Sequence, residues 1–175
     1  MDIRIASITY DSIVDGPGLR NTLFVQGCSH HCPGCHNPET WSVDAGDIKS
    51  TQEIIQQFLE SSNKSVTFSG GEPFEQAKAC GIIAKELREN DYNLWSYTGY
   101  LFDDLLKDPL KKEFLKQLDV VVDGRFILSK RSLALDYKGS SNQRVIDVQK
   151  SLKQNRIILY QKPQKTKVEK YQLYI

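Results

Sequence analysis

Apolar runs that end in glycine recur along the chain. The segments FVQGC, TFSGGEP, SYTGY and VVDGRF each place glycine and polar residues directly after an apolar stretch. Helical patterns lie between them, for example at 50–62 and around Cys80. Strands that alternate with helices predict βαβ units and a parallel sheet that is buried on both faces. Because the carboxyl ends of parallel strands meet at one edge of a sheet, we expect the four segments to converge there.

The length limits how far such a sheet can extend. The chain has 175 residues, which is enough for one hydrophobic core, whereas a complete eight-stranded barrel usually requires about 250. We therefore expect an α/β fold with a mainly parallel sheet that forms an open, partial (β/α) barrel. Residues 1–160 are expected to form this domain, and the basic segment 161–175 is expected to be a C-terminal tail that is mobile or contacts a partner.

The individual elements follow from apolar periodicity and turn residues. Strands are expected at 3–9, 22–27, 65–71, 92–100, 119–126 and 155–160. Helices are expected at 50–62 with Ser50 or Thr51 as N-cap, around Cys80, and at 101–118 with an interruption near Pro109. Segment 143–154 fits a strand or a helix, and a helix is favoured. In the helix around Cys80 the expected buried face comprises Ala79, Ile82, Ile83 and Leu87, with Cys80 as a small core residue.

Composition argues against several classes of partner. The hydrophobic fraction is 39%, the charged fraction is 26% and the formal net charge is +1, so no strong field favours nucleic acid or anionic lipid. No apolar run approaches the roughly 20 residues that a membrane helix requires. The segment MDIRIASITY lacks the pattern of a secretory signal. We expect a cytoplasmic protein that binds neither nucleic acid nor membrane.

The densest chemical signal is the loop VQGCSHHCPGCHNPETW, which contains three of the four cysteines and all three histidines. Cys28, Cys32 and Cys35 form a C-x3-C-x2-C pattern. Four interpretations compete: a structural zinc site with a histidine as fourth ligand, a redox dithiol, three buried thiols without a ligand, and a [4Fe–4S] cluster. In a reducing cytoplasm, clustered cysteines more often bind metal or perform redox chemistry than form structural disulfides.

A cluster explains the pattern best. Structural zinc sites usually combine ligand pairs that are far apart in the sequence. A dithiol formed by Cys32 and Cys35 would leave Cys28 without a role, and the polar surroundings do not resemble a core. Three thiolates on a [4Fe–4S] cluster leave one iron open for chemistry. The segment SGGEP at 69–73, at the end of another expected strand, adds a glycine pair that allows a ligand to approach the backbone.

With these two motifs the chain resembles the radical S-adenosylmethionine (SAM) enzymes. It is most similar to the glycyl-radical activases, and among them to activators of anaerobic ribonucleoside-triphosphate reductase. The segments that carry the resemblance are DGPGLRNTLFVQGCSHHCPGCHNPETW, TFSGGEPF, WSYTGY, VDGRF and GSSNQRVID. They extend from Asp15 to Asp147, which is most of the chain.

The resemblance implies a radical-SAM fold and a reaction. SAM would chelate the open iron of one [4Fe–4S] cluster, and a flavodoxin-like or ferredoxin-like protein would supply an electron. Cleavage of the sulfonium C–S bond would give methionine and a 5′-deoxyadenosyl radical, which would abstract hydrogen from a glycine of the reductase. The cofactor supplies the chemistry, and the protein orients it and excludes water and oxygen.

The resemblance also implies residue roles. Cys28, Cys32 and Cys35 would ligate iron. Gly71, with Gly70 and Glu72, would bind the methionine amino group. Gly34 and His36 would lie against the adenosine. Weaker expectations for SAM or partner contact are Tyr97, Thr98, Asp123, Arg125, Asn142, Arg144 and the segment Asp15 to Gly18.

Two departures from the family pattern leave questions open. The residue before the third cysteine is often aromatic and packs on adenine, but here it is Gly34, so Tyr97 or His36 would have to substitute. SYTG lacks an acidic residue that formate-lyase activators carry there. His30 and His31 are expected at the surface, without a catalytic role. An activase of another glycyl-radical enzyme, such as formate lyase, and a non-catalytic zinc-binding interaction module remain alternatives.

Overall fold

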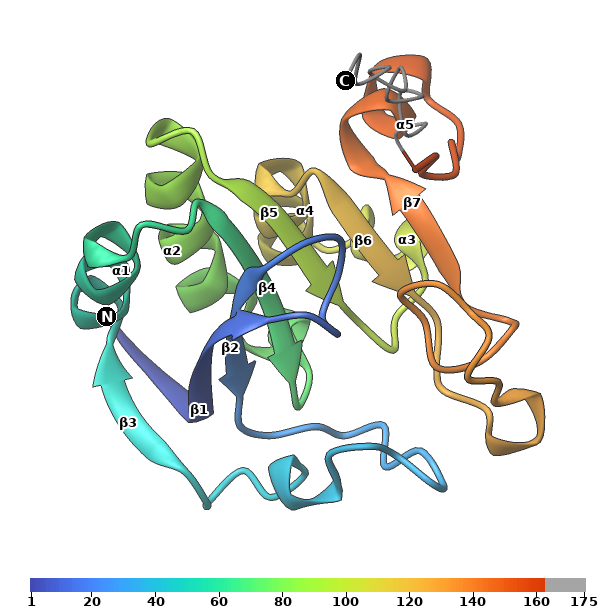
Figure 1. Cartoon of the computed structure of the whole chain (residues 1–175), viewed down its shortest axis with the longest axis horizontal. Coiled ribbons are helices and arrows are strands. Elements are labelled where there is room, and N and C mark those ends of the chain that lie inside the picture. The colour runs from blue at the N-terminus through green and yellow to red at the C-terminus, as the bar shows by residue number, and fades with distance from the viewer. Residues whose placement is uncertain (163–175) are drawn as a thin grey trace, which may run out of the picture.

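The fold is built on one sheet of seven strands, seen in a computed structural model that describes residues 1–162. The strand order is β3-β1-β2-β4-β5-β6-β7, and Figure 1 shows the sheet with its two separate edges. The strands are β1 (Asp2–Ser12), β2 (Arg20–Val25), β3 (Asp47–Ser50), β4 (Ser65–Gly70), β5 (Asn93–Tyr97), β6 (Val120–Asp123) and β7 (Arg144–Asp147). Most of the expected C-terminal tail, 163–175, lies outside the described residues.

The centre of the sheet is parallel and its margins are antiparallel. β2, β4, β5 and β6 pair in parallel, whereas β1 pairs antiparallel with β2 and β3, and β7 antiparallel with β6. The central strands are buried along almost their whole length, as expected when both faces of a parallel sheet are covered. The expected α/β class and the open, largely parallel sheet are therefore confirmed.

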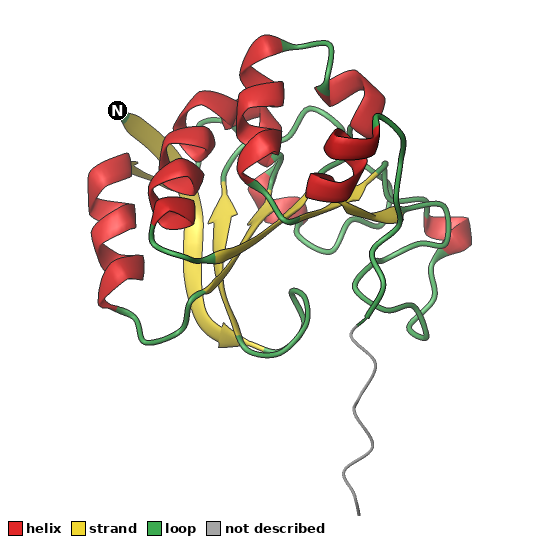
Figure 2. Cartoon of the chain, turned by 90° about the horizontal axis from the view of Figure 1, so that it is seen from above, coloured by secondary structure: helices red, strands yellow, loops and turns green. Residues whose placement is uncertain are grey.

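The helices lie on one face of the sheet (Figure 2); α1 to α4 connect successive strands, and α5 follows β7. They are α1 (Thr51–Glu60), α2 (Ala77–Glu89), α3 (Phe102–Leu105), α4 (Pro109–Gln117) and α5 (Val148–Gln154). Ser50 caps α1 by accepting a hydrogen bond from the Glu53 backbone N–H, as the sequence predicts. Asp108 caps α4 in the same way, with Pro109 at its first position, which explains the interruption of segment 101–118. No helix within residues 1–162 is long and apolar enough to cross a membrane.

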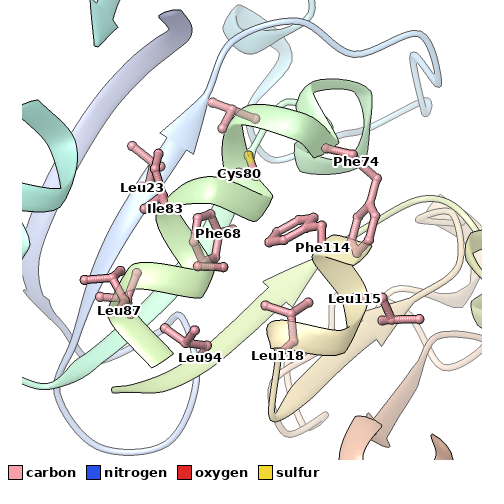
Figure 3. Close-up of a cluster of buried hydrophobic side chains, with 14 of the residues drawn as sticks. Leu23, Phe68, Phe74, Cys80, Ile83, Leu87, Leu94, Phe114, Leu115 and Leu118 are labelled. Atoms are coloured by element: carbon pink, nitrogen blue, oxygen red, sulfur yellow. The ribbon is translucent and has the colours of Figure 1, made fainter. Parts of the chain in front are cut away.

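The main core lies between the sheet and this helix layer (Figure 3). Phe68 of β4 and Phe114 of α4 meet edge to face, with their ring centroids 5.1 Å apart. Cys80 of α2 is fully buried among them, and burial raises the pKa of its thiol far above the ordinary value. Cys80 is thus the core residue that the sequence predicts. Ile82 is a correction, because it lies on the outer face of α2 and is 40% exposed.

Three element predictions near the ends of the sheet are wrong. Segment 143–154 is a strand and then a helix, because its first residues pair with β6 before α5 begins. Segment 155–160 forms no regular strand and contributes one isolated bridge, between Ile146 and Leu159. The sequence also misses β3, whose four residues pair only with β1. Each of these segments takes its conformation from pairing with a neighbour, which local periodicity does not show.

The face opposite the main helix layer carries a buried arginine. Arg20 donates hydrogen bonds to Thr67 Oγ1 (2.7 Å) and to the backbone oxygens of Val66 and Asn93 (2.8 and 2.9 Å). Its guanidinium lies 5.4 Å from the centroid of the Trp95 ring. Burial lowers the pKa of Arg20 to about 10. These contacts tie β2 to β4 and β5 on the concave side of the sheet.

Candidate active site

A cavity of about 550 Å³ opens at the carboxyl edge of the parallel strands. In Figure 1 the central arrows point toward this side, where the β2–β3 and β6–β7 loops also lie. The cavity has the size of a typical small-molecule site. It is lined from all four glycine-containing segments, by residues that include Cys28, Gly70, Gly71, Gly99 and Gly124. The expected convergence of these segments is confirmed.

The three cysteines of the loop after β2 all line this cavity. Their thiols are free and half-buried. The loop is fixed by backbone hydrogen bonds, from Cys28 N to the Trp41 oxygen (3.1 Å) and from Cys35 N to the Cys32 oxygen (3.0 Å). Burial raises the pKa of Cys28 to about 11 and also raises the pKa of Cys32. One short loop therefore presents three thiols to one space.

The glycine pair after β4 allows this strand end to lie directly against the cysteine loop. Gly70 has a φ of +92°, a conformation that favours glycine. A Cβ on Gly71 would lie 2.2 Å from the Gly27 backbone oxygen. The next residue, Glu72, donates its backbone N–H to that oxygen at 2.8 Å. The pair therefore permits close backbone packing as well as access to the cavity.

The Glu72 carboxylate joins three segments of the site. It is 1% exposed and accepts hydrogen bonds from Thr98 Oγ1 (2.8 Å) and from the backbone N–H groups of Gly99 (2.7 Å) and Phe74 (3.0 Å). Its Oε2 also lies 3.1 Å from His30 Nε2. A buried carboxylate requires such partners, so Glu72 holds the cysteine loop against the ends of β4 and β5.

His30 is a second correction, because it is not a surface residue. Its side chain is 5% exposed and packs edge-on against Tyr100, with ring centroids 4.6 Å apart. A Cβ on Gly99 would lie 2.2 Å from His30 Cδ2, so the imidazole fits only beside glycine. The 3.1 Å approach of Nε2 to Glu72 is a close contact that lacks hydrogen-bond geometry, and Nδ1 also has no hydrogen-bond partner within residues 1–162. His31 is exposed, as expected.

Several other predicted residues also face the cavity. Tyr97, Thr98 and Asp15 line it, and burial raises the pKa of Tyr97 above its ordinary range. His36 lines it as well and lies 5.2 Å from the Phe126 ring, centroid to centroid. Phe126 also faces the cavity, and sequence reasoning missed it although it ends the segment VVDGRF. Its aromatic type at a strand end was the available signal.

Several predicted residues are placed elsewhere. Among the described residues that line the cavity there is neither Gly34 nor Asp123, Arg125 or Arg144. Gly34 instead faces Leu128, to which an added Cβ would come within 2.7 Å.

Asp123 is directed into the protein. It is fully buried, accepts a hydrogen bond from the Phe102 backbone N–H (2.8 Å) and pairs with the Arg144 guanidinium. Arg125 is exposed, and its backbone oxygen accepts a hydrogen bond from the Asn142 side chain (2.8 Å). Like Arg125, Asn142 does not line the cavity in the described part of the chain. These positions support the loop after β6.

The donor set fits an iron–sulfur cluster better than a zinc ion. Within residues 1–162 no three His, Cys, Asp or Glu side chains converge closely enough to ligate one metal ion. A [4Fe–4S] cluster binds its thiolates on separate irons and so requires sulfurs spread around a common space. Trp41 also lines the cavity, and its buried Nε1 has no hydrogen-bond partner in the described chain.

Comparison with known proteins gives the same class. Residues 14–146 match a family model described as "4Fe-4S single cluster domain". The chain is 36% identical over 140 residues to the anaerobic ribonucleoside-triphosphate reductase-activating protein of Pasteurella multocida, covering 75% of this chain and 89% of the relative. The protein of that name from Enterobacteria phage T4 is 32% identical over 152 residues, covering 79% and 93%.

A crystal structure of QueE from Escherichia coli is also similar, with a TM-score of 0.47 and 16% identity over 57% of this chain and 53% of that one. The iron–sulfur class fits the three thiols that face the cavity. Within that class, the chain belongs to the family of anaerobic ribonucleoside-triphosphate reductase-activating proteins. The predicted family and cluster are therefore confirmed.

Proposed function

We infer that this protein activates anaerobic ribonucleoside-triphosphate reductase by generating a glycyl radical on it. The observation that carries this inference is the single cavity shared by three thiols and the SGGEP turn, in a chain of this family. When bound, a reduced [4Fe–4S] cluster and SAM supply the cleavage of the sulfonium C–S bond that yields methionine and the hydrogen-abstracting 5′-deoxyadenosyl radical. The protein residues bind, orient and shield these groups.

We propose that Cys28, Cys32 and Cys35 hold three irons of the cluster. They are the three cysteines of the chain that face the cavity, whereas Cys80 is in the core. Iron binding requires the thiolate form, and the raised pKa of Cys28 means that iron must displace its proton. The fourth iron would then remain without a cysteine and be open to SAM.

The methionine part of SAM would lie along the SGGEP turn. Gly70 and Gly71 line the cavity without side chains, so backbone oxygens in this turn are accessible to an ammonium group. We assign Glu72 an indirect role, because its carboxylate already accepts three hydrogen bonds from the protein. Tyr97 and Thr98, at the end of β5, complete this wall.

The adenosine part would lie against another part of the cavity lining. His36 and Phe126 are neighbouring rings that both face the cavity, and aromatic rings offer stacking surfaces for a base. We propose that this pair replaces the aromatic side chain that is often found at the position occupied here by Gly34. Gly34 would act by its backbone conformation, with a φ of +74°. Asp123 and Arg125 would then support the adenosine wall indirectly, through the loop after β6.

We further propose that residues 1–160 act as one catalytic domain with 161–175 as a tail, and that a flavodoxin-like or ferredoxin-like protein donates the electron. Three half-buried cysteines without a disulfide suit a reducing compartment such as the cytoplasm. No nucleic acid or membrane is required by this function.

Electron paramagnetic resonance (EPR) under anaerobic conditions tests the proposal. The reconstituted protein, reduced and mixed with SAM, should produce a glycyl radical signal on anaerobic ribonucleoside-triphosphate reductase and not on formate lyase. Cys28→Ala should abolish that signal, and Cys80→Ala, which changes a cysteine in the core, should retain it if the variant folds. A signal on formate lyase alone would favour the alternative partner.

A further inference from the structure

Two loops that are distant in sequence carry exposed apolar side chains to the mouth of the cavity. Ile13 and Val14, between β1 and β2, are 74% and 75% exposed, and Leu133, between β6 and β7, is 91% exposed. Val14 and Leu133 both line the same cavity. Isolated exposed apolar residues are common, but Val14 and Leu133 line one cavity and Ile13 directly precedes Val14.

The loop that carries Leu133 is fixed at its base. Ser141 N donates to the Lys130 backbone oxygen (2.9 Å), and Arg131 and Ser140 form an isolated antiparallel β-bridge. Gln143 Oε1 accepts hydrogen bonds from the backbone N–H groups of Gly139 (2.9 Å) and Ser140 (3.1 Å). The position of the loop over the cavity is therefore defined by its own hydrogen bonds and does not depend on Leu133.

The inner side of the loop is packed and its tip is not. Tyr137 meets Trp95 edge to face at 5.3 Å between ring centroids, and Leu135 is half-buried beside the cavity. Leu133 makes almost no such contact, since nine-tenths of its surface is exposed. The fold does not explain an apolar residue at this position, and contact with a partner would.

We propose that loop 131–139, with Leu133 as its anchor, binds the glycine-bearing segment of the reductase. This rests on the proposed function. A radical formed inside the cavity reaches a glycine only if the segment that carries the glycine passes over the rim. Leu133 on one side and Ile13 with Val14 on the other are the apolar surfaces that such a segment meets.

The charge of the loop indicates what flanks the apolar contact. Lys130 and Arg131 are exposed beside Leu133 and form no ion pair within residues 1–162, whereas Asp136 is paired with Lys162 at 2.6 Å. The unpaired charges are thus positive. The segment that fits is an apolar one with acidic side chains next to it, and its binding should weaken as salt concentration rises.

The test compares Leu133→Gln with Leu110→Gln, the same change at a 56% exposed leucine on α4. Isothermal titration with full-length reductase should give about tenfold weaker binding, or more, for Leu133→Gln. The control should bind like the unchanged protein. Because Leu133 is exposed, its variant should fold normally, and its reductase-independent SAM cleavage should be unchanged.

The outcomes separate this inference from the function on which it rests. Binding of Leu133→Gln within twofold of the control would overturn it, as would loss of SAM cleavage in that variant alone, since the loop would then belong to the SAM site. Absence of SAM cleavage in the unchanged protein would contradict the proposed function instead. A photoreactive benzoylphenylalanine at position 133 should crosslink to the glycine-bearing segment, and crosslinks confined to other segments would also overturn it.

Discussion

Gly99 is a residue at which the segment after β5 packs directly against the cysteine loop. Its missing side chain leaves room for the His30 imidazole, which lies against Glu72. Glu72 also accepts hydrogen bonds from Thr98 and from the Gly99 backbone. One added carbon atom at position 99 would therefore disturb the contacts that anchor the cysteine loop. The geometry of the proposed iron ligands should therefore depend on residues that do not touch iron.

Gly99→Ala should impair cluster assembly. The new Cβ would lie 2.2 Å from His30 Cδ2, so the imidazole and the loop that carries it must move. We expect iron and sulfide per protein after anaerobic reconstitution to fall to about half or less. Gly81→Ala is the matched control, because its Cβ would make an ordinary contact with Phe114 at 3.5 Å; within α2 it should add ~0.5 kcal/mol or more of stability. Equal cluster content in the two variants would contradict the role of Gly99.

Cys28 should alkylate slowly in the metal-free protein. Burial raises its pKa to about 11, so only a small fraction is thiolate near neutral pH. The thiolate fraction of an unperturbed cysteine levels off above the ordinary thiol pKa. The thiolate fraction of Cys28 should instead continue to rise about tenfold per pH unit up to about pH 11. Iodoacetamide labelling followed by peptide mass spectrometry at pH 7 to 10 measures this. A rate that levels off near pH 9 would show an unshifted thiol.

At the scale of elements, the antiparallel strand β7 directly follows a loop that lines part of the site. It is joined to β6 by backbone pairing and by the ion pair between Asp123 and Arg144. Asp123 also accepts the first free N–H group of α3, from Phe102. The pair therefore fixes the ends of three elements beneath the loop that carries Phe126 and Leu133.

Arg144→Ala should lower the free energy of unfolding by about 2 kcal/mol, since it leaves a fully buried carboxylate without its cation while the arginine itself is partly solvated. Urea unfolding monitored by circular dichroism measures the change. Arg156→Ala is the control, because within residues 1–162 the Arg156 side chain hydrogen-bonds only to Gln154, at the surface. A loss below about 0.5 kcal/mol, with weaker SAM binding, would instead favour direct contact of this pair with SAM.

Elements with strong local signals could be predicted, and those defined by a neighbour could not. The parallel strands follow from apolar runs that end in glycine, and α1 follows from its cap at Ser50. β7 and β3 hold their conformation through pairing, so the local pattern of segment 143–154 left strand and helix open, and the favoured helix is correct only for its second part. His30 shows the same limit within the site, because nothing local indicates that Gly99 and Glu72 make a buried place for it.

At the scale of the whole molecule, the hydrophobic core and the candidate active site occupy different parts of the sheet. The core between the sheet and the helices contains most of the large buried side chains and Cys80, and the carboxyl edge contains the three other cysteines. The motifs at that edge were readable in the sequence because each is a short run of residues at a strand end. Their convergence required only that the strands be parallel.

The central claim is that three thiolates hold a [4Fe–4S] cluster whose fourth iron is free to bind SAM. Mössbauer spectroscopy of protein reconstituted anaerobically with ⁵⁷Fe tests it directly. The account predicts four irons per chain, of which one changes its spectrum when SAM is added while the other three do not. Stoichiometric zinc without sulfide, or a cluster in which no iron responds to SAM, would contradict it.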